Sequence, residues 1–188
     1  MRRCSASCWR FVALFAWLAG PLACAHETAL QGDVLQKGDV RIQIGPVAPT
    51  WRRLEVTGAD LAFRDDQREG SLLFDTRCGQ RDDDAPLTAL TQHLIMGTTE
   101  REFDSQDVVP FDHREAMHTM LRAKLDGVPM QYDIYVMKKD GCVYDLVYVA
   151  PPGRFADGTA DFERFVQGTR VVSSHVAGDP ATGASRDP

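Results

Sequence analysis

The chain has 188 residues, of which 44% are hydrophobic and 26% are charged, and its formal net charge at pH 7 is −6. This length is sufficient for one domain with its own hydrophobic core, without a structural metal or several disulfides. An acidic surface repels nucleic-acid phosphates, and the sequence contains no basic stripe, so nucleic acid is not expected as a partner.

The first 25 residues have the order of a secretory signal peptide. Three arginines precede the apolar run FVALFAWLAGPLA (11–23), and no acidic residue occurs before Glu27. The run is too short, and too broken by Gly20 and Pro21, for a transmembrane helix. Removal of residues 1–25 takes away three basic residues and no acidic one, so the net charge becomes about −9.

Two processing sites overlap at the end of this signal. Ala23 and Ala25 are small residues at the two positions that signal peptidase recognises. Cys24 also resembles the cysteine of a bacterial lipobox, although Pro21 stands where that motif usually has leucine. The first site predicts a secreted protein. The second, which we prefer, predicts a periplasmic lipoprotein with Cys24 as its lipid anchor, for example in the outer membrane.

Residues 26–38 have little periodicity and are expected to form a tether to a domain at 39–172. Four short runs of alternating apolar and polar residues begin this domain, each bounded by Gly, Pro or Asp. Such runs are typical of β-strands. The predicted strands cover residues 40–44, 52–56, 60–64 and 71–78.

A helix is predicted within PLTALTQHLIMG (86–97), because three leucines recur on one helical face and Gly97 ends the pattern. Asp82 to Asp84 precede it, where the helix dipole favours negative charge. A short strand is expected at 100–103.

The next segment predicts three antiparallel strands, at 115–125, 128–139 and 142–150. The dipeptides Asp126-Gly127 and Asp140-Gly141 each separate two alternating apolar runs, which is the strongest short-range signal of a β-hairpin.

A second helix is predicted at 159–168, with Phe162, Phe165 and Val166 on one side. The tail at 173–188 is rich in Gly, Pro, Ser and Ala, so it is expected to be disordered. The fold class is therefore α+β, an antiparallel sheet flanked by two helices.

Two cysteines remain in the folded part, Cys78 and Cys142. In an oxidising periplasm they are expected to form a disulfide, and a bridge that closes so long a loop contributes roughly 4 kcal/mol in the chain-entropy model. Two buried free thiols are the alternative.

Two-residue loops fix strand register, so cross-strand partners can be predicted. One face is almost wholly apolar and must be core. Its pairs are Leu125 with Val128, Ala123 with Met130, Leu121 with Tyr132, Met117 with Val136, Ile134 with Val147, and Tyr132 with Val149.

The opposite face is mixed, with His118 opposite Tyr135 and Asp133 opposite Tyr148. Such an amphipathic, aromatic surface suits a protein partner or a small amphiphile. The alternative is that the last helix covers this face and tyrosine hydroxyls satisfy His118 and Asp133. The candidate binding residues are His118, Arg122, Asp133, Tyr135, Tyr144 and Tyr148.

No catalytic or metal site is predicted, and no cofactor. The stretch HREAMH (113–118) resembles a zinc-protease motif, but its histidines are five apart instead of four and fall on opposite faces of a strand. The H-x-E pattern lacks the P-C-x-x-C of a zinc deaminase. Nucleophilic catalysis by Cys78 or Cys142 is less economical than a disulfide.

The order of elements resembles the PsbP-like α/β/α sandwich over roughly residues 50–170. The likeness is carried by Trp51 with GADLAF (58–63), the helix after APL (85–87), REA (114–116), the two DG hairpins, YVAPP (148–152) and DFERFV (161–166). Such proteins usually have glycine in the turn before REA, where this chain has His113, so the resemblance implies a backbone with positive φ there.

Within this fold, the chain resembles Gram-negative envelope lipoproteins, and the stretch KKDGCVYDLVYVAPP (138–152) carries this likeness. Proteins of the wider fold act as assembly factors, envelope lipoproteins and small-protein binders, and the fold is not known as a general catalytic scaffold. The resemblance thus implies a non-enzymatic envelope protein that serves as an accessory or adaptor subunit. The alternative is a carrier or sensor for a small apolar or lipid-like molecule bound between sheet and helix.

Overall fold

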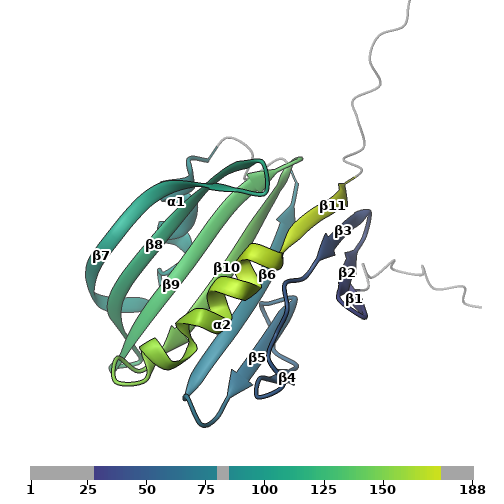
Figure 1. Cartoon of the computed structure of the whole chain (residues 1–188). Helices are drawn as coiled ribbons and strands as arrows, with labels where there is room; N and C mark the ends of the chain where they lie inside the picture. The colour runs from purple at the N-terminus through teal and green to yellow at the C-terminus, as the bar shows by residue number, and fades with distance from the viewer. Residues whose placement is uncertain (1–27, 80–84, 175–188) are drawn as a thin grey trace, which may run out of the picture.

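A seven-stranded antiparallel sheet forms the centre of the molecule, and the strands lie in the order β4-β5-β6-β10-β9-β8-β7 (Figure 1). The computed structural model describes residues 28–79 and 85–174. The strands of this main sheet are β4 (Arg52–Leu54), β5 (Leu61–Asp65), β6 (Gly70–Cys78), β7 (Thr98–Phe111), β8 (Arg114–Leu125), β9 (Val128–Lys139) and β10 (Cys142–Ala150).

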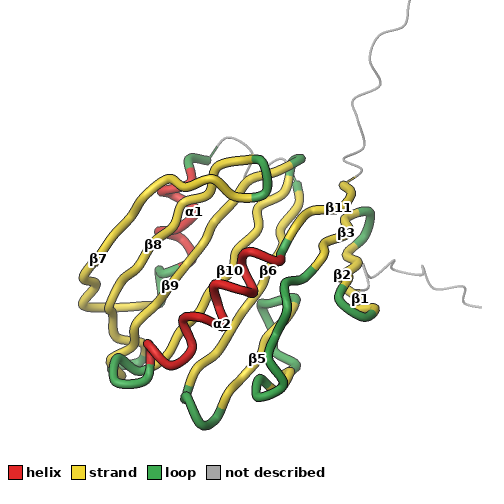
Figure 2. Tube along the Cα trace, viewed as in Figure 1, coloured by secondary structure: helices red, strands yellow, loops and turns green. Residues whose placement is uncertain are grey.

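Two helices pack on opposite faces of this sheet, α1 (Leu87–Leu94) on one and α2 (Phe155–Gly168) on the other (Figures 1 and 2). Each helix closes its own apolar cluster. Leu90 of α1 is buried with Leu121 and Ile134, while Phe162 of α2 is buried with Leu146. The predicted α+β class, an antiparallel sheet flanked by two helices, is confirmed.

The two Asp-Gly dipeptides form the predicted tight hairpins. Asp126 and Gly127 have φ of 50° and 83°, and Asp140 and Gly141 have φ of 52° and 71°. All six predicted core pairs occur in the observed register, as do the opposite positions of His118 and Tyr135. Loop chemistry therefore fixed which residues face each helix.

The predicted disulfide is present between Cys78 and Cys142. The two residues are direct partners of β6 and β10, with their Cα atoms 4.1 Å apart. The bridge thus ties the N-terminal half of the sheet to the C-terminal hairpins.

The turn between β7 and β8 has the expected left-handed backbone. His113 has φ of 62°, and Asp112 before it has φ of 45°. Two consecutive positive φ angles are the mark of a type I′ hairpin turn, so His113 takes the position that glycine usually holds.

The expectation of a tether at 26–38 is wrong for most of that segment. Residues Thr28–Gln31 and Val34–Lys37 form strands β1 and β2, and a small sheet has the order β1-β2-β3-β11. Its other strands are β3 (Val40–Gln43) and β11 (Arg170–Ser174). Gly-Asp turns join β1 to β2 and β2 to β3, and Leu35 is fully buried, so local turns and one core residue order this segment.

Three further boundaries differ from expectation. β7 is a 14-residue edge strand, whereas only a short strand at 100–103 was predicted. Its sequence is largely polar and has no alternating apolar pattern, and the strand is held by backbone pairing to β8. α2 begins at Phe155, four residues early, where the buried Phe155 anchors its first turn. Strand β11 includes Ser173 and Ser174, which were expected in the tail.

The predicted signal peptide with Cys24, the Asp82 to Asp84 segment and the tail from 175 lie outside the described residues. Within 28–79 and 85–174, no helix has the length and apolar composition needed to span a bilayer.

Candidate functional site

The side of the main sheet that faces α2 is only partly covered. α2 packs on β10 and β6, whereas β7 and β8 lie beyond the helix at the sheet's edge (Figure 1). We call the uncovered part the open face and define it by Asp107, His118, Met120, Gln131 and Tyr135. Asp107 is exposed and the other four are half-buried, so a partner can reach this part of the predicted mixed face.

His118 of the open face, on β8, is hydrogen-bonded to the buried Asp133 on β9. The imidazole Nε2 lies 2.8 Å from Oδ1 of the carboxylate, and the two side chains are 22% and 6% exposed. The imidazole also stacks on the ring of Tyr135, with centroids 4.2 Å apart and an interplanar angle of 15°. The alternative, in which tyrosine hydroxyls satisfy His118 and Asp133, is therefore wrong for this pair, because the imidazole and the carboxylate are hydrogen-bonded to each other.

Tyr135 stands at the border between the open face and α2. Its ring contacts His118 on one side, and Phe111 and Phe162 on the other, at centroid distances of 6.1 and 6.0 Å. Burial, with a smaller effect of the Asp133 charge, raises the pKa of Tyr135 to about 12. The phenol therefore stays protonated at neutral pH and can donate a hydrogen bond.

Two of the predicted binding residues, Tyr144 and Tyr148, are not accessible. Both are buried in the core cluster that α2 closes, with 1% and 0% exposure. The Tyr148 hydroxyl donates to the carbonyl of Phe155 at 2.8 Å, and its ring stacks on Phe155. Tyr144 and Tyr148 therefore follow the alternative given above, in which the last helix covers the mixed face.

Arg122 is exposed at the far end of β8, and acidic side chains of β7 neutralise it. Its Nη2 lies 2.7 Å from Oδ1 of Asp104 and 3.1 Å from Oε1 of Glu102. The hydrogen bond and charge of Asp104 raise the pKa of the guanidinium, so Arg122 remains a cation held within an acidic edge.

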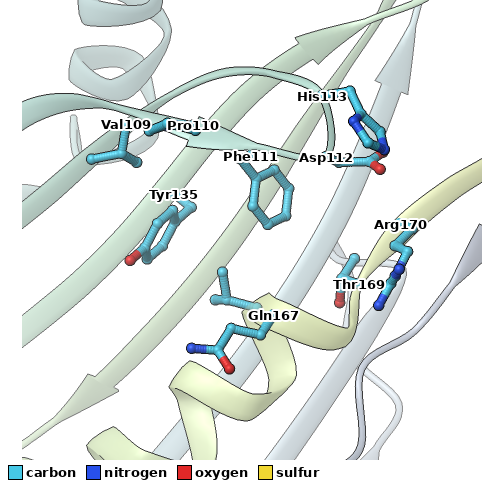
Figure 3. Close-up of a pocket in the computed structure, with 10 residues that line it drawn as sticks. Val109, Pro110, Phe111, Asp112, His113, Tyr135, Gln167, Thr169 and Arg170 are labelled. Carbon is cyan, nitrogen blue, oxygen red and sulfur yellow. The ribbon is translucent and has the colours of Figure 1, made fainter.

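The structure adds a pocket that sequence analysis did not predict. It lies between the β7–β8 turn and the C-terminal end of α2, beside the open face, and has a volume of about 450 Å³ (Figure 3). Tyr135 lines both the pocket and the open face. The pocket joins the β7–β8 turn to the end of α2, and these segments are more than fifty residues apart in the sequence, so local patterns could not predict it. The sequence indicated only the unusual turn, through the positive φ expected at His113.

The two histidines of HREAMH are separated as predicted. His113 belongs to the turn and the pocket rim, whereas His118 lies on the open face. Among the described residues, no group of three His, Cys, Asp or Glu side chains could hold a metal ion. In the same part of the chain no hydroxyl or thiol is hydrogen-bonded to His118, whose hydrogen-bond partner is the Asp133 carboxylate.

The fold and this surface define an α/β/α sandwich with one half-open sheet face. No family model and no curated protein matches the sequence. Solved structures do match, and the chain has the PsbP-like fold.

Three matching structures illustrate the likeness. Cyanobacterial PsbP (CyanoP) from Synechocystis is 14% identical, with a TM-score of 0.53 over 71% of this chain and 86% of that one. LpqN of Mycobacterium tuberculosis, described as involved in cell envelope biogenesis, is 14% identical, with a TM-score of 0.50 over 69% and 82%. A point mutant of the protein Mog1 is 13% identical, with a TM-score of 0.53 over 73% and 93%.

Proposed function

We propose that this protein is an exported, non-enzymatic envelope lipoprotein that acts as an accessory or adaptor subunit and binds a partner protein through its open face. The observation that carries the proposal is the half-covered sheet, on which His118 and Tyr135 are ordered but accessible. Support for the compartment comes from the signal-like N-terminus and from LpqN, which shares the fold and is described as involved in envelope biogenesis.

The open face has the properties of a protein-binding surface. His118 and Tyr135 are held by stacking and by the Asp133 hydrogen bond, so they lose little conformational entropy when a partner binds. Aromatic side chains and methionine, here Tyr135 and Met120, are enriched in interfaces. Asp107, beside Glu102 and Asp104 on the same strand, gives the edge an acidic rim, which favours a partner with basic residues at that position.

Site-specific photo-crosslinking tests this assignment in the native envelope. A photoreactive amino acid replaces Met120, on the open face, or Met96, which is 64% exposed after α1 on the other side of the sheet. We expect Met120 to give a crosslink to one protein and Met96 to give none. Equal crosslinking at both positions, or crosslinking at Met96 alone, would place the interface elsewhere.

Native mass spectrometry of the purified protein distinguishes an adaptor from a carrier. A stoichiometric protein of the same mass as the crosslinked partner supports the adaptor. A bound small molecule with no protein partner supports the carrier.

The lipid anchor has its own test, because it depends on Cys24 alone. Cells are labelled with radioactive palmitate, and the wild type is compared with Cys24→Ser. We expect label only in the wild type. An unlabelled wild type rejects lipidation and leaves secretion after Ala25.

A further inference from the structure

The pocket beside the open face combines an apolar wall with a cationic end. Val109 and Phe111 of β7, Tyr135 of β9 and Val166 of α2 form the apolar wall. Figure 3 shows Tyr135 and Val109 at one end of the pocket, and His113 and Arg170 at the other. Its volume of about 450 Å³ lies within the range of small-molecule sites, roughly 300–1,000 Å³.

The apolar wall is fixed by packing. Phe111 is 8% exposed, and its ring lies 6.1 Å from that of Tyr135. Val166 is also buried, at 5% exposure, whereas Val109 is half-buried. An apolar group placed here would be removed from water without rearrangement of the core.

The charged end carries a cation that the protein itself does not neutralise. Arg170 is exposed and forms no ion pair with any residue in 28–79 or 85–174. The neighbouring carboxylate of Asp112 is already engaged, because Oδ2 lies 2.7 Å from Lys139 Nζ and accepts a hydrogen bond from the Val171 amide at 3.0 Å. His113 adds an imidazole, a further hydrogen-bonding group, to this end.

We propose that this pocket binds a small amphiphile with one anionic group, which Arg170 and His113 hold while the apolar part lies on Val109, Phe111 and Tyr135. A free phosphate or acetate would use the charged end alone, and a neutral alcohol would use only the wall. The ligand must therefore carry both an anionic group for the charged end and an apolar part for the wall. Tyr135 is shared between the pocket and the open face, but the binding of a small molecule in the pocket does not depend on the binding of a protein at the open face, so either assignment can fail without the other.

The test uses the full chain, purified in the form that its host processes, and titrates it with dodecanoate, dodecanol and acetate. Methyl NMR of Val109 and Val166 reports the location of binding. We expect dodecanoate to saturate with one equivalent and to shift both methyl signals, dodecanol to bind more weakly, and acetate to have no effect. Failure of dodecanoate to bind at millimolar concentration, or shifts that spare Val109 and Val166, would overturn the proposal.

Variants of Arg170 distinguish a specific contact with the ligand's charge from nonspecific binding. Arg170→Gln is expected to weaken dodecanoate binding at least tenfold, because the charge-assisted hydrogen bond to the carboxylate is lost, while dodecanol binding stays unchanged. Arg170→Lys should retain most of the affinity. The control is Arg114→Gln, which removes the same charge from an exposed neighbour outside the pocket lining. Equal losses in Arg170→Gln and Arg114→Gln would mean that only the overall charge matters.

Discussion

The imidazole of His118 and the carboxylate of Asp133 form a partly buried pair on adjacent strands, with Nε2 and Oδ1 2.8 Å apart. The Asp133 side chain is only 6% exposed, so its carboxylate has little access to water, while the His118 side chain is 22% exposed. A group that is both anchored in the core and accessible is the feature that makes the open face a candidate site.

The first prediction concerns this pair. His118→Ala leaves the buried carboxylate of Asp133 without its imidazole partner, so we expect the free energy of unfolding to fall by about 1–3 kcal/mol. Urea denaturation monitored by circular dichroism measures the change. Arg122→Ala is the control, because its ion pairs are exposed to solvent and such pairs contribute little to stability.

The His118→Ala/Asp133→Asn double variant checks the cause. It should lose less stability than the sum of the two single variants, because each single change already breaks the same interaction. Strict additivity would show that the two residues do not act as a pair.

The second prediction concerns the contact of α2 with β10 at Gly158. A Cβ atom there would lie 2.4 Å from the Tyr148 hydroxyl oxygen and 2.7 Å from Cζ, so the fully buried ring must move. We expect Gly158→Ala to lower the free energy of unfolding by about 1–3 kcal/mol, the usual cost of overpacking. Gly153→Ala is the matched control, since nothing lies within 4 Å of its Cβ position. Urea midpoints that coincide for the two variants would contradict this packing.

The third prediction compares two buried tyrosines. The Tyr148 hydroxyl donates to the Phe155 carbonyl, whereas the Tyr144 hydroxyl has no hydrogen-bond partner among the described residues. Tyr148→Phe should therefore cost about 1 kcal/mol, while Tyr144→Phe should be neutral or stabilising by up to about 1 kcal/mol. Thermal and urea unfolding of the two variants give the comparison, and a larger loss for Tyr144→Phe would show that its hydroxyl is satisfied.

The fourth prediction is a loss of stability at alkaline pH. Burial raises the pKa values of Tyr135 and Tyr148 to about 12, above the value of about 10 in an unfolded chain. The unfolded state therefore loses these protons first. The corresponding stability is complete below pH 10 and is lost as the pH rises from about 10 through 12.

Urea unfolding at a series of pH values, with tyrosinate absorbance as a second signal, measures this loss. Tyr148→Phe should show a shallower decline between pH 10 and 12 than the wild type. Parallel declines would assign the alkaline transition to other groups.

The fifth prediction concerns the disulfide. The bridge between Cys78 and Cys142 spans 64 residues of sequence, and its removal should lower the free energy of unfolding by roughly 4 kcal/mol in the chain-entropy model. Cys78→Ser/Cys142→Ser provides the measurement. A reductant should destabilise the wild type and leave the double variant unchanged, whereas an equal response of both would mean that the bridge does not form in the cell.

The sequence predicted strands and their register correctly where a turn dipeptide or a regular alternation of apolar residues marked them. Asp126-Gly127 and Asp140-Gly141 set the register of three strands, and this register placed His118 opposite Tyr135 as predicted. Gly32 and Gly38 also lie in turns with positive φ, but residues 26–38 have little apolar periodicity, so the sequence predicted a tether there. Most of strand β7 carried no such signal, because its polar residues do not alternate with apolar ones. Backbone pairing to β8 holds them in the sheet.

The sequence by itself determined the α+β class, the hairpin register and the pairing of the two cysteines, since these depend on alternation, turn chemistry and compartment. Only the tertiary structure decided which part of the mixed face stays open. Contacts between distant residues position α2, for example the hydrogen bond from Trp51 Nε1 to Asp161 Oδ2 and that from the Gly45 amide to Thr169 Oγ1. Such contacts join residues more than a hundred positions apart and produce no periodic pattern in the sequence. The burial of Tyr148, the exposure of His118 and the pocket at Arg170 therefore depend on tertiary packing.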